Sequence, residues 1–293
     1  MSLAVTLPEA LIEPERRSAG GAPPGGPPAL PGRHPLRGAA ASVALAAVGF
    51  AALVGVWALI SWRTPSIPGP SATLTEMREL LRDPLRDGAG NDKGIFIQLR
   101  GSLGRVFKGF LLATAVGIPF GLVLGASRLA WQAANPVIQL LRPVSPLAWF
   151  PIWLTMFQDA PQAAVWTIFL TALWPTVINT AAGAASVPVD QRNVAAVFRF
   201  GRFAYLRHIL LPHSLPSIVT GLRLSMGIAW LVIVATEMLA GGVGIGFFVW
   251  DSYNALNLAK VICAIGIIGV VGLVLDMVFL RLGRLVSPSE VHR

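Results

Sequence analysis

The stretch QRNVAAVFRFGRFAYLRHILLP, residues 191–212, interrupts some of the most apolar sequence in a chain of 293 residues. It carries four arginines and one histidine, and it ends on Leu-Leu-Pro. Apolar residues recur at helical spacing on both sides of Gly201, which predicts a helix, a turn and a second helix that share one apolar face. Such a face can lie on an anionic membrane surface or fill a groove in a soluble partner. Both alternatives place a membrane or a partner beside this insert.

The composition of the chain identifies its class. Hydrophobic residues make up 54% of the sequence and charged residues only 13%, whereas a soluble domain carries about 25% charged residues. The chain is therefore predicted to be an integral membrane protein. Its one cysteine, Cys263, excludes a disulfide within the chain and a cysteine-based zinc site. The net charge of +9 fits basic cytoplasmic loops rather than nucleic-acid binding, and we expect no nucleic-acid partner.

The apolar segments predict an all-α fold with six transmembrane helices. The six predicted spans are residues 38–62, 106–126, 147–157, 163–185, 218–239 and 261–280. Residues 1–37 end in dense Gly and Pro and predict a disordered tail, and residues 286–293 form a second tail. Residues 63–104 are polar and mixed in charge, which predicts an outer loop with a short interfacial helix. Residues 105–285 then form the membrane core, which holds five spans and the insert at about 188–212.

The distribution of Lys and Arg orients these spans. The insert has four arginines against the single Asp190. The N-terminal tail has Arg16, Arg17, Arg33 and Arg37, and the C-terminal end has Arg281, Arg284 and Arg293. With six spans, these three segments lie on one side of the membrane, which the positive-inside rule assigns to the cytoplasm. The loop 63–104 is also basic but carries five acidic residues. Because the rule counts Lys and Arg alone, this loop weakens the assignment without reversing it.

The insert resembles the cytoplasmic coupling motif of ABC-importer permeases. That motif reads Glu-Ala-Ala, then a glycine four residues after the last alanine, then nine residues and Ile-x-Leu-Pro. Aligned on residues 209–212, Ile-Leu-Leu-Pro, the acidic position falls on Asn193, the alanines on Val194 and Ala195, and the glycine on Arg199. The second half of the motif matches, while the acid and the glycine are absent. Gly201, two residues later, is expected to form the turn instead.

Longer segments are similar to the nitrate/bicarbonate branch of these permeases, whose relatives carry taurine and aliphatic sulfonates. They are LRPVSPLAWFPIWLTMFQDAPQAAVWTIFLTALWPTVINT, from residue 141, and GLRLSMGIAWLVIVATEMLAGGVGIGFFVWDSYN, from residue 221, and the resemblance extends over residues 92–282. It implies a homodimer of permeases, two cytoplasmic ATPase subunits and an outer substrate-binding protein. It also implies a bacterial inner membrane, both termini in the cytoplasm and a small inorganic anion as cargo, most of all nitrate or nitrite. Bicarbonate, cyanate and taurine or aliphatic sulfonates are the alternative substrates, and a membrane scaffold without a pathway is the alternative from another class.

The resemblance assigns the insert to ATPase coupling. Its apolar face, Val197, Phe198, Phe203 and Leu206, is expected to fill a groove in the ATPase, with Arg199, Arg202 and Arg207 at the rim. The full set of expected coupling residues is Asn193, Ala195, Val197, Phe198, Arg199, Gly201, Arg202, Phe203, Leu206, Ile209 and Pro212.

Two ionisable residues in the fifth predicted span are candidates for the anion pathway. Arg223 and Glu237 lie 14 residues apart, nearly four helical turns, and so share a face. Ionisable groups at membrane depth line a pathway or pair with another group. Arg223 can serve as a counter-charge for an anion, or it can bond to backbone carbonyls or Asp276, or extend toward the cytoplasmic surface. Glu237 would repel an anion, which favours a structural or gating role.

Polar and aromatic residues in two other spans complete the candidate pathway. Thr176, Asn179 and Thr180 carry donors that can replace part of an anion's hydration shell, or they can bond helices together. Trp149 can form an apolar constriction or pack at the membrane interface. The stretch GGVGIGFFVW, residues 241–250, predicts a loop or re-entrant segment buried in protein, which the resemblance places toward the binding protein.

The sequence carries no catalytic motif. The phosphate-binding loop Gly-x4-Gly-Lys-Ser/Thr is absent, so ATP and Mg²⁺ are expected on the partner ATPase and no cofactor on this chain. No His, Asp or Glu cluster has the spacing of metal ligands, and no nucleophile stands near a base. We therefore expect that the chain is not itself an enzyme.

Overall fold

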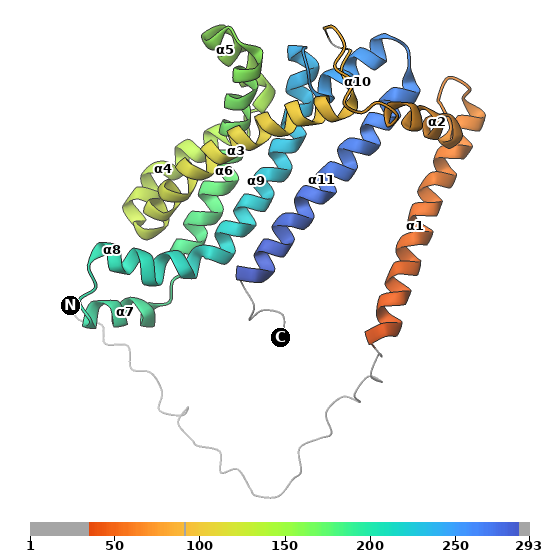
Figure 1. The fold of residues 1–293 in the computed structure, drawn as a ribbon. Coiled ribbons are helices and arrows are strands. Elements are labelled where there is room, and N and C mark those ends of the chain that lie inside the picture. The colour runs from red at the N-terminus through yellow and green to blue at the C-terminus, as the bar shows by residue number, and fades with distance from the viewer. Residues whose placement is uncertain (1–34, 91, 287–293) are drawn as a thin grey trace, which may run out of the picture. The chain divides into compact units, whose positions relative to one another are not determined.

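The computed structural model describes residues 35–90 and 92–286, and this part of the chain is helical, without a β-strand. The elements are α1 (Pro35–Arg63), α2 (Pro70–Leu80), α3 (Ile95–Ala126), α4 (Arg128–Leu141), α5 (Pro146–Phe157), α6 (Ala160–Ala185), α7 (Val189–Val197), α8 (Arg202–Tyr205), η1 (Leu206–Leu210), α9 (Leu211–Ala240), α10 (Ile245–Asn254) and α11 (Leu258–Val286) (Figure 1). The chain divides into two compact units between Leu53 and Val54, and the second unit holds helices α2 to α11, with the insert and the polar network described below. The two predicted tails lie outside the described residues, except that α1 already begins at Pro35 and α11 ends at Val286.

Five helices are long and apolar enough to cross a membrane, which agrees with five of the six predicted spans. The predicted span 147–157 corresponds to α5, which has 12 residues and is about 18 Å long, too short to cross about 30 Å of hydrocarbon alone. Helices α4 and α5 meet at an angle of 91° and count as one span only if the bent pair is taken together. Pro143 lies just after the end of α4 and cannot continue it, and Pro146 begins α5 at a position where a helix needs no N–H donor.

Helix α3 begins at Ile95, so the predicted outer loop 63–104 ends ten residues too late. The sequence looked polar there because Gln98, Arg100 and Ser102 lie in the first turns of the helix. The structure buries Gln98 and Ser102 in the interior, where a hydropathy pattern cannot place polar side chains. The predicted loop or re-entrant segment at 241–250 consists of a glycine turn and the first residues of α10, which begins at Ile245.

Helices α3, α6 and α9 form the centre of the membrane core. Glycines on α3 allow α6 to approach closely: a Cβ atom at Gly109 would lie 2.7 Å from the Cβ of Ile168, and one at Gly117 would lie 2.9 Å from Cγ2 of Thr176. Small residues at such spacing let membrane helices pack backbone against backbone. Beyond the glycine contacts, Ile168 packs with Met226 of α9 in a buried apolar cluster.

The connections place the two functional ends of the core far apart. The α7–α8 insert follows α6 and precedes α9, and in Figure 1 it lies at one end of these two helices. The turn after α9 and helix α10 lie at the other end of α9. Leu111, Val123 and Leu231 are exposed along the helices between the two ends, as expected for surfaces that meet lipid or another apolar partner.

Candidate functional site

The insert is a helix, a turn and a second helix, but the second helix is not separate from the following span. Helix α8 passes through the π-helical turn η1, Leu206–Leu210, directly into α9. Residues Arg202–Ala240 therefore form one helical segment of 39 residues. Single π-helical turns inside helices are rare overall, and many of those known lie at functional sites. A displacement of α8 is thus connected through the backbone to α9.

Three of the four residues expected on the apolar face of the insert are exposed. Val197 is 78% exposed, Phe198 70% and Phe203 72%. The fourth residue, Leu206, instead packs against a buried cluster that contains Leu122. Leu206 is the first residue of η1, and this cluster also contains Ala184 of α6.

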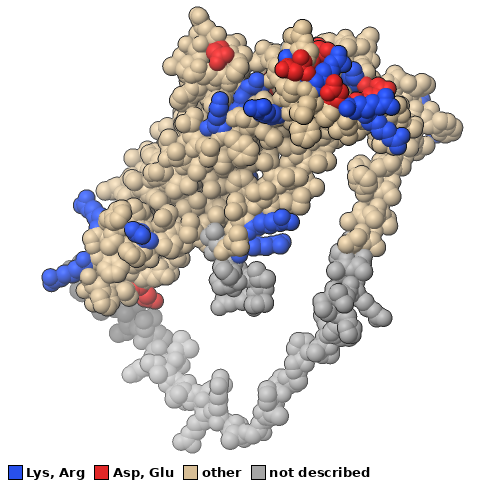
Figure 2. All heavy atoms as spheres, in the orientation of Figure 1, with Lys and Arg blue, Asp and Glu red and all other residues tan. Residues whose placement is uncertain are grey.

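The remaining expected coupling residues divide between the interior and the surface. Ala195 is buried, Ile209 packs against the same cluster as Leu206, and Asn193 and Pro212 are exposed. The side chains of Arg199, Arg202 and Arg207 are exposed and form no ion pair within residues 35–90 and 92–286. Figure 2 shows basic side chains at the α7–α8 end of the molecule.

The turn of the insert is formed by Arg199 and not by Gly201. Arg199 has φ +49°, in the left-handed region that favours glycine, and its N–H donates to the carbonyl of Ala196 at 3.1 Å. Gly201 has φ −65° and ψ 160°, an extended backbone before α8 that any residue can adopt. The expectation that Gly201 replaces the motif glycine is therefore wrong, because the aligned position itself keeps the left-handed conformation with an arginine.

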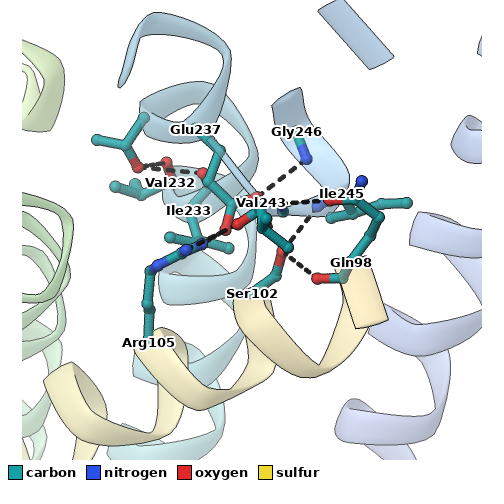
Figure 3. A network of polar contacts seen from close by, with 11 residues as sticks. Gln98, Ser102, Arg105, Val232, Ile233, Glu237, Val243, Ile245 and Gly246 are labelled. Carbon is teal, nitrogen blue, oxygen red and sulfur yellow. Dashed lines mark hydrogen bonds and ion pairs between the residues drawn. The ribbon is translucent and has the colours of Figure 1, made fainter. Parts of the chain in front are cut away.

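A buried polar network joins α3, α9 and α10 at the opposite end of α9 (Figure 3). Glu237 is 2% exposed. Its Oε1 accepts a hydrogen bond from Nη1 of Arg105 at 2.5 Å. Its Oε2 accepts from Oγ of Ser102 at 2.8 Å and from the N–H of Gly246 at 2.9 Å. The carboxylate is thus neutralised and bonded on both oxygens, which fits a structural role better than a role in an open pathway.

The same network caps the N-terminus of α10. The first N–H groups of a helix lack partners within the helix. Here Gly244 N–H donates to Oε1 of Gln98 at 2.5 Å and Ile245 N–H donates to Oγ of Ser102 at 2.9 Å. Arg105 adds a bond from Nη2 to the carbonyl of Val243 at 2.7 Å. The polar face of α3 therefore holds the α9–α10 turn in place.

Sequence reasoning did not single out Gln98, Ser102 and Arg105. Their spacing of four and then three residues puts them on one face of a helix, which is the signal that could have found them. The spacing alone does not reveal a polar network, because the partner of this face, Glu237, lies on another helix.

Arg223 forms an interhelical ion pair, one of the alternatives considered from the sequence. Its Nε donates to Oδ1 of Asp276 at 2.6 Å and its Nη2 donates to Oδ2 at 2.8 Å. The pair links α9 to α11, and the two side chains are 40% and 42% exposed. The guanidinium of Arg223 thus donates two hydrogen bonds to one carboxylate of the same chain, in the bidentate geometry that is typical of strong ion pairs.

The polar candidates on α6 are mostly enclosed between helices. Thr176 and Thr180 are fully buried. Oγ1 of Thr176 bonds to the carbonyl of Ala172 at 2.9 Å and to Oγ of Ser225 at 2.8 Å, whereas Oγ1 of Thr180 has no partner among the described residues. Asn179 is half-buried and donates from Nδ2 to the carbonyl of Pro175 at 2.8 Å. Only the bond between Thr176 and Ser225 joins two helices, α6 and α9, whereas the bonds to Ala172 and Pro175 lie within α6.

Trp149 lines a cavity of about 280 Å³ at the bend between α4 and α5. Trp174 and Pro175 of α6 form part of the opposite wall. Trp149 stacks on Trp153, with ring centroids 6.4 Å apart. The aromatic residues of α5 thus pack together, and Trp149 also borders an open space.

The arrangement of a helical membrane core with a projecting insert agrees with known proteins. Residues 117–289 match the family of binding-protein-dependent transport system inner membrane components. The chain is 45% identical over 245 residues to the nitrate import permease protein NrtB of Synechocystis sp., covering 83% of this chain and 89% of that protein. It is 46% identical over 213 residues to the bicarbonate transport system permease protein CmpB of Synechococcus elongatus, covering 72% and 77%. The taurine transport system permease protein TauC of Escherichia coli is 30% identical, covering 67% and 72%.

A solved structure has the same fold. The inward-facing MetNI methionine ABC transporter aligns with a TM-score of 0.59 at 15% identity, covering 72% of this chain and 98% of the matched chain. At this identity the likeness concerns the fold alone. Together with the family match over residues 117–289 and the close relatives, it identifies the chain as a multi-pass membrane protein and a component of a transporter. The chain belongs to the family of binding-protein-dependent transport system inner membrane components.

Proposed function

We propose that this chain is the membrane-spanning subunit of an ATP-driven importer whose substrate is nitrate. The similarity to nitrate permeases over 83% of the chain carries the proposal. The second observation in support is the insert, whose exposed apolar side chains are suited to a soluble partner. Nitrite belongs to the same proposal, because it is also a small monovalent oxyanion.

In this proposal, ATP hydrolysis occurs on two separate ATPase subunits, which bind ATP and Mg²⁺. The insert lies in the cytoplasm and docks in a groove of one ATPase through Val197, Phe198 and Phe203. A large aromatic side chain in such a groove typically dominates the binding energy of an interface. Both termini lie on the same side as the insert, and two copies of the chain form the membrane unit.

The continuous helix from α8 to α9 gives the ATPase a mechanical connection to the outer end. Helix α9 has 30 residues and is about 45 Å long, enough to cross the membrane. Glu237, near the C-terminal end of α9, bonds to the first turn of α10. A movement of the insert is thereby transmitted to the α9–α10 turn, which we place toward the substrate-binding protein.

Bicarbonate is the second candidate substrate, because the bicarbonate permease CmpB is 46% identical over 72% of the chain. Nitrate and bicarbonate are both planar monovalent oxyanions, so the permease fold alone does not separate them. Cyanate, taurine and aliphatic sulfonates remain further alternatives. A membrane scaffold without a pathway remains the alternative from another class.

Reconstitution tests the proposal directly. The native complex is purified through a tag on this chain, placed in proteoliposomes and supplied with its binding protein and ATP. We expect an ATPase to copurify, ¹⁵N-nitrate to accumulate, and excess bicarbonate or taurine to compete weakly. If bicarbonate accumulates and nitrate does not, the substrate is bicarbonate. If no ATPase copurifies and no anion is taken up, the chain is a scaffold.

A further inference from the structure

A groove of about 1150 Å³ runs along the first half of α3, at the end of the molecule opposite the insert. One wall is α3 and the other is the start of α6, where Gln162 and Trp166 line it. Val243, in the turn before α10, closes the groove at one side. The groove therefore borders the Glu237 network, although none of the candidate pathway residues chosen from the sequence lines it.

The groove is basic. Its lining contains Arg100, Arg105 and Lys108 and a single acid, Asp159. Arg105 is neutralised by Glu237. Arg100 and Lys108 are exposed, and neither has an ion-pair partner in the described part of the chain. In Figure 2, a group of basic side chains stands over the first half of α3, apart from the mixed acidic and basic group near α2.

The two cations without partners flank a gap. Gly104 lies four residues from each of them, so Arg100, Gly104 and Lys108 follow one another on the same side of the helix. A Cβ atom at Gly104 would meet nothing within 4 Å. The space above Gly104, between the two charged side chains, is therefore not filled by other protein atoms.

The position along α3 places this charge at a membrane surface. Helix α3 has 32 residues, about 12 more than the roughly 20 that cross the hydrocarbon. The cations lie in its first half, so the groove begins at the surface and leads inward. A charged side chain without a partner costs free energy beside the hydrocarbon. Where such a side chain faces water, it typically belongs to an ion pathway. A groove of one sign of charge with apolar walls also raises the local concentration of the opposite ion.

We propose that this groove is an outer binding site for a small oxyanion, in which Arg100 and Lys108 attract the anion before it crosses the membrane. The inference rests on the proposed function for the direction of transport and for nitrate as the probe. Lys108 and Arg100 act as point charges, so an exchange of one basic residue for the other preserves the site.

The charge of the groove can be measured without transport. In a Cys263→Ser background, Gly104→Cys is labelled with a negatively charged and a positively charged methanethiosulfonate reagent. A unit charge about 8 Å away in water changes the reaction rate of a singly charged reagent about twofold. We expect the ratio of anionic to cationic labelling to fall about fivefold with Lys108→Gln or Arg100→Gln and to stay high with Lys108→Arg. Ser71→Cys, on α2 outside the groove, should show no dependence on Lys108.

Nitrate and lipid composition distinguish the two sources of an oxyanion. Nitrate at millimolar concentration should slow labelling of Gly104→Cys in zwitterionic nanodiscs, and anionic lipid should change the labelling little. Suppression by anionic lipid together with no effect of nitrate would overturn the proposal in favour of a lipid headgroup. If the ratio of anionic to cationic labelling does not change with Lys108→Gln, the proposed anion site is wrong.

Uptake then links the groove to transport. In the reconstituted complex, Arg100→Gln/Lys108→Gln should lower nitrate uptake at low nitrate about tenfold, while stimulation of the ATPase by the binding protein persists. The control Arg82→Gln removes an exposed charge just after α2 and should leave uptake unchanged. Loss of ATPase stimulation in the double variant would overturn the proposal and make the groove a docking surface for the binding protein. If the unmodified complex transports no nitrate, the proposed substrate fails, and the labelling ratio still decides whether the groove attracts anions.

Discussion

Replacing Glu237 with glutamine should destabilise the protein strongly, although the side chains have nearly the same shape. The carboxylate accepts three hydrogen bonds, from Arg105, Ser102 and the N–H of Gly246. An amide offers one oxygen and one NH₂ group. If the oxygen keeps the bond with Arg105, the NH₂ group faces the N–H of Gly246, and two donors oppose each other.

The magnitude follows from the burial of the pair. Removing one partner of a buried ion pair costs about 3–5 kcal/mol, because the other charge is left uncompensated. The side chain of Arg105 is 17% exposed, at the edge of the basic groove, so water solvates it in part. We therefore expect the lower end, about 3 kcal/mol. For a chain of this size the melting temperature falls by about 2–4 °C per kcal/mol, or about 6–12 °C in total.

The assay is the thermal stability of the purified complex in detergent, measured as the monodisperse fraction after heating at one fixed scan rate. Glu237→Gln and Arg105→Gln should each lower the midpoint, and the double variant should lose less than the sum of the two. A Glu237→Gln protein with the melting temperature of the wild type and no transport would refute the structural role. Glu237 would then act in the gate or in the pathway itself.

Three further predictions concern the insert and the second ion pair. Phe203→Ala should weaken ATPase binding by about 2 kcal/mol or more, which is about thirtyfold in Kd. Arg202→Ala should weaken it less, and its effect should shrink at high salt. Pull-down of the ATPase measures both effects, and a larger effect of Arg202→Ala would indicate that the insert lies on lipid. Arg199→Gly should raise the melting temperature by up to a few degrees, because it removes about 1 kcal/mol of left-handed strain, whereas a fall would mean that the arginine side chain stabilises the turn. Arg223→Ala should lower the melting temperature more than Arg223→Ala/Asp276→Ala, because the single change leaves a carboxylate in the membrane without a partner. Lost transport in a double variant of normal stability would instead assign Arg223 to the anion path.

The spans were predictable from sequence because lipid allows few alternatives. A backbone in hydrocarbon must satisfy its own hydrogen bonds, so long apolar runs are helical, and α1, α3, α6, α9 and α11 follow from that rule. The rule fails where polar residues enter the interior. The first turns of α3 were missed because Gln98 and Ser102 find buried partners on α9 and α10, about 140 residues away in the sequence. Local hydropathy carries no information about such partners.

The candidate site divides in the same way. The helix-turn-helix of the insert was predictable because its amphipathic pattern is local, and the structure leaves Val197, Phe198 and Phe203 exposed. The conformation at Arg199 was not predictable from residue type, since glycine is the residue that normally adopts it. The pairing of Arg223 with Asp276 was one of several alternatives, and only the packing of α9 against α11 decides between them.

The ion pairs along α9 limit how this helix can move. Arg223 ties its middle to α11, and Glu237 ties its end to α3 and α10. Sliding α9 alone would break both pairs, at about 3–5 kcal/mol for the buried one, so we expect α3, α9 and α11 to move as one body. The adjustable parts then lie where the helices are interrupted, at η1 beside the insert and at the 91° bend between α4 and α5. Under the proposed function, the continuous segment Arg202–Ala240 would carry a displacement of the insert to the α9–α10 turn, where the Glu237 network meets the basic groove, and η1 would set the angle between the insert and α9.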